Sequence, residues 1–132
     1  MNSYSYHADY DPPFPCLQIV IANPDNALRT ELLDALIDTG SDGTLVPLVY
    51  LEQLNAVALV ETGIRSHWGE RRRVHLFMVN LLLGDFTLPG VFVVGDDQGD
   101  EIILGRNVLN KLRLLLDGPR EQTDLLKAGE VM

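Results

Sequence analysis

The sequence contains very little cysteine, few basic side chains and no long apolar segment. Cys16 is the single cysteine, which excludes an intramolecular disulfide and a metal site built on cysteines, and which fits a reducing compartment. Ten basic side chains stand against 19 acidic ones, and the net charge of −9 argues against nucleic acid as a partner. The apolar runs are far shorter than the roughly 20 residues that span a bilayer, and no basic start precedes an apolar run at the N-terminus. These absences predict a soluble, cytoplasmic protein that binds neither nucleic acid nor membrane.

What the sequence does contain is a succession of short apolar segments separated by turn residues. The 132 residues suit one domain, and 46% of them are apolar, which is enough for a buried core. Alternation over 73–79 predicts one arm of a long β-hairpin with a glycine-flanked tip. Residues 49–54 fit one or two helical turns, and a short helix is expected from Asn107. We expect an all-β, closed barrel-like domain with one short C-terminal helix over residues 17–117, after an extended N-terminal arm (1–16) and before a weakly ordered C-terminal tail (118–132).

One aspartate stands at the end of an apolar run and inside a tight polar turn. Asp38 follows Ala35–Ile37 and precedes Thr39, Gly40 and Ser41. Shielding by strand residues on one side, with hydroxyls and backbone N–H groups on the other, makes Asp38 a candidate acid or base. Thr39 can hold the turn with its hydroxyl, Gly40 lets the backbone approach a substrate, and Ser41 can donate a hydrogen bond to the carboxylate. Asp-Thr-Gly is also a common turn, so the tripeptide alone does not decide the chemistry.

Two segments together resemble a known family. The run from Asp34 to Leu45 resembles the active-site loop of the retropepsins, the single-domain aspartic proteases of retroviral type. Residues 102–109 are similar to the second signature of that family, in which two apolar residues precede Gly-Arg and a short helix. The resemblance covers about residues 17–116 and implies an aspartic endopeptidase with Asp38 as the catalytic aspartate, supported by Thr39, Gly40 and Ser41.

The same resemblance implies further roles. It matches Asp42 and Arg106 to an ion pair that ties the active-site loop to the helix, and it implies neither a metal ion nor another cofactor. The tip of the long hairpin corresponds to a flap that closes over a peptide or protein substrate. The flap residues differ from the glycine-rich retroviral tip, and Trp68 fits either a substrate contact or packing on the hairpin. The expected flap and substrate-binding residues are Ser66, His67, Trp68 and Gly69.

The number of such aspartates predicts the assembly. Retropepsin chemistry uses two carboxyls that share one proton, because like charges about 3 Å apart do not both ionise. The sequence contains a single Asp-Thr-Gly and no Asp-Ser-Gly; Asp42-Gly43-Thr44 has the wrong order, and Asp117-Gly118-Pro119 lacks the hydroxyl. The second carboxylate must then come from an identical chain, so we expect a two-fold symmetric homodimer.

Two other functions fit the same residues. A retropepsin-fold dimer with weak or no catalysis would serve as a peptide-binding module, and a protease could cleave mainly its own termini. The remaining motifs point to structure: His7, His67 and His75 lack metal-ligand spacing, and the acidic residues 96–101 do not have the spacing of an EF-hand. Cys16 adjoins an apolar strand and is expected to be a small core residue.

Overall fold

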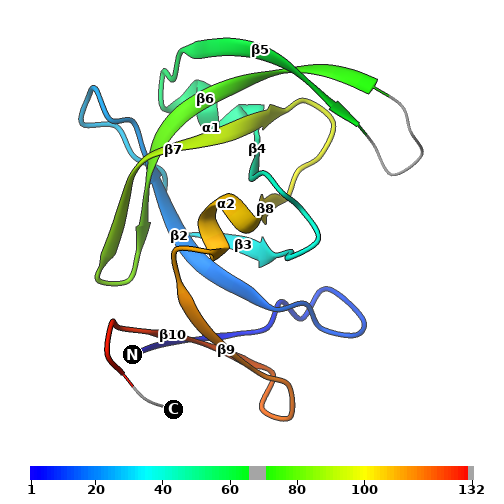
Figure 1. Cartoon of the computed structure of the whole chain (residues 1–132), viewed down its shortest axis with the longest axis vertical. Helices are drawn as coiled ribbons and strands as arrows, with labels where there is room; N and C mark the ends of the chain where they lie inside the picture. The colour runs from blue at the N-terminus through cyan, green and yellow to red at the C-terminus, as the bar shows by residue number, and fades with distance from the viewer. Residues whose placement is uncertain (66–70, 131–132) are drawn as a thin grey trace.

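The chain is mostly β-structure arranged in two sheets. The computed structural model describes residues 1–65 and 71–130. Figure 1 shows a barrel that occupies most of the molecule and a smaller sheet, formed by the chain ends, beneath it. The elements are β1 (Asn2–Ser5), β2 (Cys16–Ala22), β3 (Leu33–Ile37), β4 (Leu45–Pro47), α1 (Leu48–Gln53), β5 (Ala58–Arg65), β6 (Arg71–Leu83), β7 (Phe86–Asp96), β8 (Ile102–Leu104), α2 (Arg106–Leu109), β9 (Arg113–Asp117) and β10 (Gln122–Leu126).

The larger sheet closes on itself. Its strand order is β2-β3-β8-β4-β7-β6-β5, and a further pairing of β2 with β6 closes the barrel and leaves β5 outside. Alternation along the strands fills the interior: Leu17, Ile19 and Ile21 of β2 are fully buried, whereas Gln18 is exposed. Closure removes open sheet edges around the core. The expected all-β closed barrel is confirmed.

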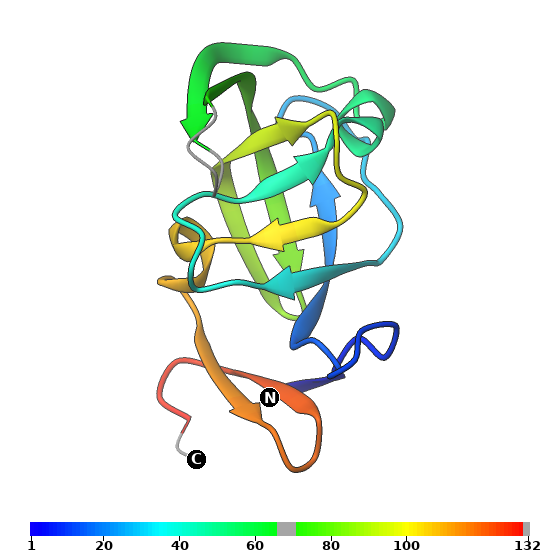
Figure 2. The same ribbon diagram turned by 90° about the vertical axis from the view of Figure 1, so that its right-hand side faces the viewer.

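The predicted long hairpin is formed by β5 and β6. Their antiparallel pairing runs from Ala58↔Phe77 to Arg65↔Arg71. The expected flap residues Ser66, His67, Trp68 and Gly69 lie outside the described residues. The hairpin extends away from the barrel beside the loop that carries Asp38 (Figures 1 and 2).

Both expected helical segments are present. The helix α1 begins directly after Pro47 and buries Leu51, and Leu54 at its C-cap is buried on the same face. The helix α2 follows Gly105 and buries Val108 and Leu109. In the described ranges, no helix combines the length and apolar composition needed to cross a membrane.

The expectation of a weakly ordered tail after residue 117 is wrong for 122–126. These residues form β10, the central strand of a three-stranded sheet with β1 and β9, and Thr123 to Leu126 are all buried. Leu125 belongs to the same core cluster as the barrel residues. The sheet also contacts the β6–β7 turn, where Gly84 has φ +58° and the Asn2 side chain occupies the space that a Cβ would need. The first part of the N-terminal arm is therefore a strand of this sheet, and its pairing partner, β10, lies at the other end of the chain.

The terminal sheet contains a buried carboxylate that links its stability to pH. Ser3 Oγ and Gln122 Nε2 donate hydrogen bonds of 2.7 and 2.8 Å to Asp124 Oδ1. These bonds favour the charged form and lower the pKa of the Asp124 carboxyl. A carboxyl with a lowered pKa in the folded state stabilises the fold at neutral pH, and this contribution is lost as pH falls through the ordinary aspartate range toward the folded pKa.

We predict that Asp124→Asn flattens the acid side of the stability profile, because the asparagine does not titrate. Urea unfolding at a series of pH values between pH 7 and about pH 3 measures the free energy of unfolding across a range that brackets the ordinary aspartate pKa. Ser3→Ala, which removes one donor and keeps the carboxyl, should give an intermediate slope. An Asn variant with the wild-type slope would contradict the assignment.

Candidate active site

Two neighbouring parallel strands deliver the predicted site residues to one place. The strands β3 and β8 pair in parallel with Ile37 opposite Leu104. Parallel strands end at the same edge of a sheet, so Asp38 and Gly105 leave the barrel side by side. The backbone N–H of Asp38 donates a 3.1 Å hydrogen bond to Leu104 O and extends this pairing by one residue. The two resembling segments are therefore in direct contact.

The Asp38 carboxylate is half-buried in a tight turn. The Gly40 N–H donates a 2.9 Å hydrogen bond to Asp38 Oδ1, and the Ser41 N–H donates to Asp38 O at 3.2 Å. A Cβ at Gly40 would lie 3.1 Å from Asp38 Oδ1, so glycine lets the backbone approach the carboxylate closely. The Ser41 hydroxyl does not donate to the carboxylate as expected; it donates to Gly43 O at 2.7 Å. It therefore stabilises the loop rather than the charge.

The loop packs against the start of α2 through bare backbone. A Cβ added at Gly105 would overlap the Gly43 carbonyl oxygen and lie 2.9 Å from Ser41 O. Gly105 has the extended angles φ −94° and ψ −176°, so space and not backbone strain demands glycine here. The Arg106 N–H then donates a 2.8 Å hydrogen bond to Ser41 O. Removing this contact would separate the Asp38 loop from the helix.

The Arg106 side chain holds the same loop, although its partner is not the predicted one. Its Nη1 donates a 2.7 Å hydrogen bond to Thr39 O. In the part of the chain that the structure describes, no ion pair joins Arg106 to Asp42; Asp42 O instead accepts from the Asn107 N–H at 3.3 Å. A backbone carbonyl lies within reach of the guanidinium, and it serves the tethering role that the resemblance assigned to Asp42.

The sequence did not predict a polar pair beneath the loop, formed by the buried Thr44 and the exposed Asn107. Thr44 is 1% exposed; its Oγ1 donates to Asn107 Oδ1 at 2.7 Å and accepts from the Gly105 N–H at 3.1 Å. The Asn107 amide continues the network by donating to Phe92 O on β7 at 3.0 Å. The network connects the active-site loop, the helix and a barrel strand. Asn107 directly follows the Gly-Arg pair in the sequence, and this position is the one feature of the sequence that could have indicated its role.

The other candidate residues have structural surroundings. Cys16 is buried as expected, and burial together with the nearby Asp34 carboxylate raises the pKa of its thiol to about 11. Arg73 of the hairpin pairs with Glu61 across β5 and β6 at 3.0 Å, on an exposed surface. Among the described residues, no group of three or more His, Cys, Asp or Glu side chains is arranged to hold a metal ion.

The architecture and the Asp38 loop define the fold: a closed all-β barrel in which a Gly-Arg helix start packs against an Asp-Thr-Gly turn. The chain has the retropepsin-like fold. It is similar to a retropepsin-like aspartic protease from Rickettsia conorii, with a TM-score of 0.63 and 10% identity over 94% of this chain and 90% of that one.

Two viral enzymes are similar as well. One is EIAV protease, solved with an inhibitor, at a TM-score of 0.57 and 20% identity over 74% of this chain and 86% of that one. The other is the simian foamy virus (mac) protease, at a TM-score of 0.52 and 18% identity over 73% and 92%. No protein-family model and no curated protein sequence matches the chain. At these identities the likeness defines the fold, and the site residues must support any function.

We predict that Gly105→Ala destabilises the domain by about 1–3 kcal/mol, the usual cost of forcing an extra carbon into packed structure. Urea unfolding measures the change. Gly43→Ala is the matched control, because a Cβ at Gly43 meets no heavy atom within 4 Å. Equal stability of the two variants would contradict the packing described at Gly105.

Proposed function

We propose that the protein is an aspartic endopeptidase of retropepsin type that works as a homodimer on extended peptide or protein substrates. The observation that carries this proposal is the Asp38 turn: a half-buried carboxylate accepts from the Gly40 N–H in a loop packed on Gly105. A fold by itself accommodates many functions, so the turn and not the barrel favours peptide hydrolysis. The single cysteine fits work in the cytoplasm.

In the proposed dimer, one Asp38 from each chain meets the other at the two-fold axis and the two share one proton. The charged carboxylate takes a proton from a water molecule while the water oxygen bonds to the scissile carbonyl carbon. The neutral carboxyl gives its proton to the carbonyl oxygen, which yields a tetrahedral gem-diol. The carboxyl that took the water proton then gives it to the amide nitrogen while the other carboxylate takes a proton from a gem-diol hydroxyl; the C–N bond breaks, and the pair again holds one proton. The two groups titrate as a coupled pair, with activity expected from about pH 4 to 7.

The neighbouring residues support this chemistry. Thr39, Gly40 and Ser41 fix the geometry of the loop, and Arg106 tethers it through Thr39 O. The expected flap would exclude solvent and align an extended substrate by strand-like pairing. Its proposed substrate contacts are Ser66, His67, Trp68 and Gly69.

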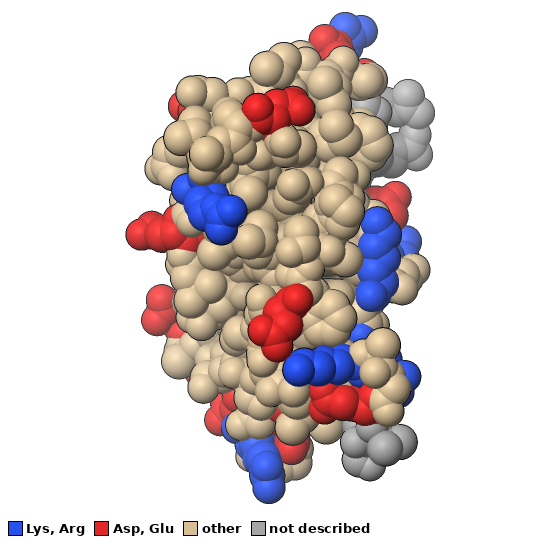
Figure 3. Space-filling view, turned by 90° about the vertical axis from the view of Figure 1, so that its left-hand side faces the viewer, with Lys and Arg blue, Asp and Glu red and all other residues tan. Residues whose placement is uncertain are grey.

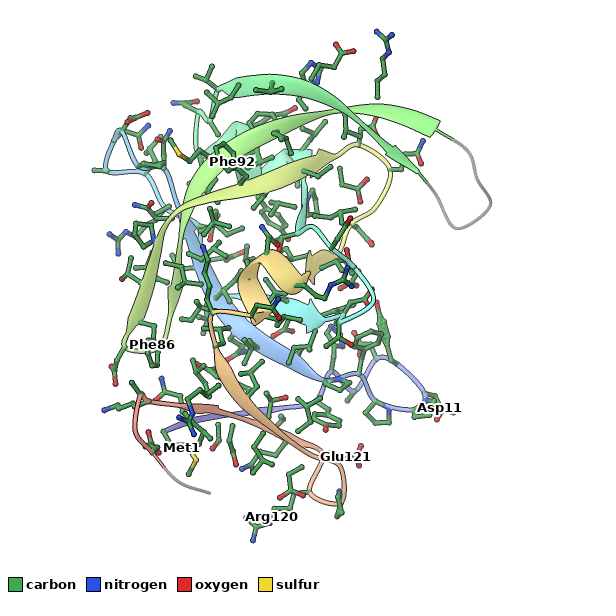
Figure 4. All side chains as sticks on the ribbon, viewed as in Figure 1. Met1, Asp11, Phe86, Phe92, Arg120 and Glu121 are labelled. Carbon is green, nitrogen blue, oxygen red and sulfur yellow. The ribbon has the colours of Figure 1, made fainter. Side chains whose placement is uncertain are left out.

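The open edge of β9 is the proposed dimer seam. The Tyr6 N–H donates a 2.9 Å hydrogen bond to Glu121 O, which shows that every second residue from Glu121 along β10 bonds to β1. The residues between them bond to β9. By the same alternation, the N–H and C=O groups of Leu114 and Leu116 point away from β10, to the open edge of β9. Leu116 is 45% exposed there. In Figure 2, β9, α2 and the loop after β3 lie on one side of the molecule. Figure 4 shows Arg120 and Glu121 at the free end of the β9–β10 hairpin. Pairing of two β9 strands would join both terminal sheets across the axis.

We predict that Asp38→Asn abolishes cleavage of a peptide library between about pH 4 and 7, because an amide cannot share the proton, while the melting temperature and dimer fraction stay near wild type. Thr39→Ser, which keeps a hydroxyl, is the conservative control and should retain activity. Cleavage that persists in Asp38→Asn would overturn the assignment. A wild-type dimer that binds library peptides without cleaving them would support the alternative, a catalytically inactive peptide-binding module.

We also predict that Leu116→Pro weakens the dimer by about tenfold or more, because it removes an N–H on the open edge from both copies. Leu116→Ala keeps this N–H and serves as the matched control for the lost side chain. Sedimentation velocity over a concentration series measures the dissociation constant, and specific activity should fall in parallel. An unchanged constant in the proline variant would place the seam elsewhere.

A further inference from the structure

The terminal sheet has a second open edge, formed by β1. The strand β1 pairs with β10 on one side, and within the described ranges no strand pairs with its other side. Two open hollows of about 490 and 600 Å³ lie along that side and share Ser3, Tyr4 and Gln18 in their linings. They form one groove between β1 and β2, which we call the β1 groove. In Figure 2, β1 lies at the opposite edge of the terminal sheet from β9, so pairing at β9 leaves the β1 groove accessible.

Unused backbone groups line the β1 groove. Because the Tyr6 N–H donates to Glu121 O, the alternation of an antiparallel pair turns the N–H and C=O groups of Ser3 and Ser5 away from β10. A contact from β2 supports this orientation of the Ser5 carbonyl: Cys16 Sγ on β2 donates a 3.3 Å hydrogen bond to Ser5 O. The Ser3 N–H, the Ser3 C=O and the Ser5 N–H therefore face the groove, and both serines are exposed. Such an edge is a template for one more strand.

The two ends of the β1 groove differ in chemistry. At one end Asp9 and Asp34 are exposed, and the Asp34 carboxylate lies 3.7 Å from His7 Nε2. At the other end Val20, Leu82 and Leu32, which is 60% exposed, present apolar surface. Figure 3 shows that residues other than Lys, Arg, Asp and Glu cover most of one face of the molecule. A matching strand would carry a basic side chain at one end and an apolar side chain at the other.

We propose that the β1 groove binds an extended segment of another protein by strand addition, with a lysine or arginine of that segment at the Asp9–Asp34 end. This occupant is favoured over a second copy of the chain for two reasons: neither hollow is lined by lysine or arginine, and the Met1 ammonium at the start of β1 is already paired with Glu130 Oε1 at 3.2 Å. A second β1 therefore offers no unpaired lysine or arginine to the acidic end. The binding uses neither the Asp38 loop nor the β9 edge. It gives the protein a means to hold a partner that is independent of catalysis.

The test uses the full chain carrying Asp38→Asn, so that cleavage does not consume the probe. The probe is a fluorescein-labelled peptide of alternating valine and threonine with one lysine near its N-terminus, and fluorescence anisotropy measures its dissociation constant. Ser3→Pro removes the N–H that faces the groove, whereas Ser3→Ala keeps it; both lose the hydroxyl bond to Asp124. We expect Ser3→Pro to weaken binding about tenfold, the effect of one lost hydrogen bond, and Ser3→Ala to weaken it less than about twofold.

If Ser3→Pro folds poorly, a double-mutant cycle that removes one charge from the protein and one from the peptide tests the proposal independently. Asp34→Asn keeps an acceptor for Gln18 Nε2 and should weaken the lysine peptide but not the same peptide with glutamine in place of lysine. Absence of binding, equal losses in Ser3→Pro and Ser3→Ala, or no dependence on Asp34 would overturn the proposal. A peptide-free dimer that Ser3→Pro dissociates would overturn it as well, since the occupant would then be a second copy.

Discussion

The close contact between Gly105 and the Asp38 loop is the constraint on which the site depends. A residue with any side chain at 105 would overlap the Gly43 carbonyl, and the loop would have to move away from α2. The contact also brings the Gly105 N–H to Thr44 Oγ1, the Arg106 N–H to Ser41 O and the Arg106 guanidinium to Thr39 O. Every one of these bonds fixes backbone and not a mobile side chain. These bonds hold the loop against the barrel, and the Gly40 N–H of this loop donates the hydrogen bond to Asp38 Oδ1.

The second organising feature is that the two chain ends pair within one chain. The strand β10 lies between β1 and β9 and buries Leu125 in the common core, so the strands of one chain form the terminal sheet by themselves. A three-stranded sheet has two open edges, and here they lie on opposite sides. The β9 edge is on the side of the Asp38 loop and suits assembly of a two-chain site. The β1 edge faces away and suits a different partner.

The parts that the sequence predicts are those that depend on local pattern. Alternation in 73–79 predicts the hairpin, and the apolar-to-glycine segments predict the strands that lead to Asp38 and Gly105; their parallel pairing is seen in the structure. The missed parts depend on contacts between distant segments: β10 needs β1 as its partner, and Thr44 needs Asn107. Pro89-Gly90 suggests a break, yet β7 continues through it, because Gly90 takes φ +64° and its N–H bonds to Asn80 Oδ1 beside a register shift in β6.

The central claim is that one chain supplies half of a catalytic site. The most direct measurement mixes wild-type chains with Asp38→Asn chains at constant total concentration, well above the dimer dissociation constant, and follows peptide cleavage after exchange. If both carboxylates are required, activity follows the square of the wild-type fraction, and an equal mixture retains about a quarter of it. Activity that falls in direct proportion to the wild-type fraction, to about one half at that point, would mean that each chain works alone and would contradict the account.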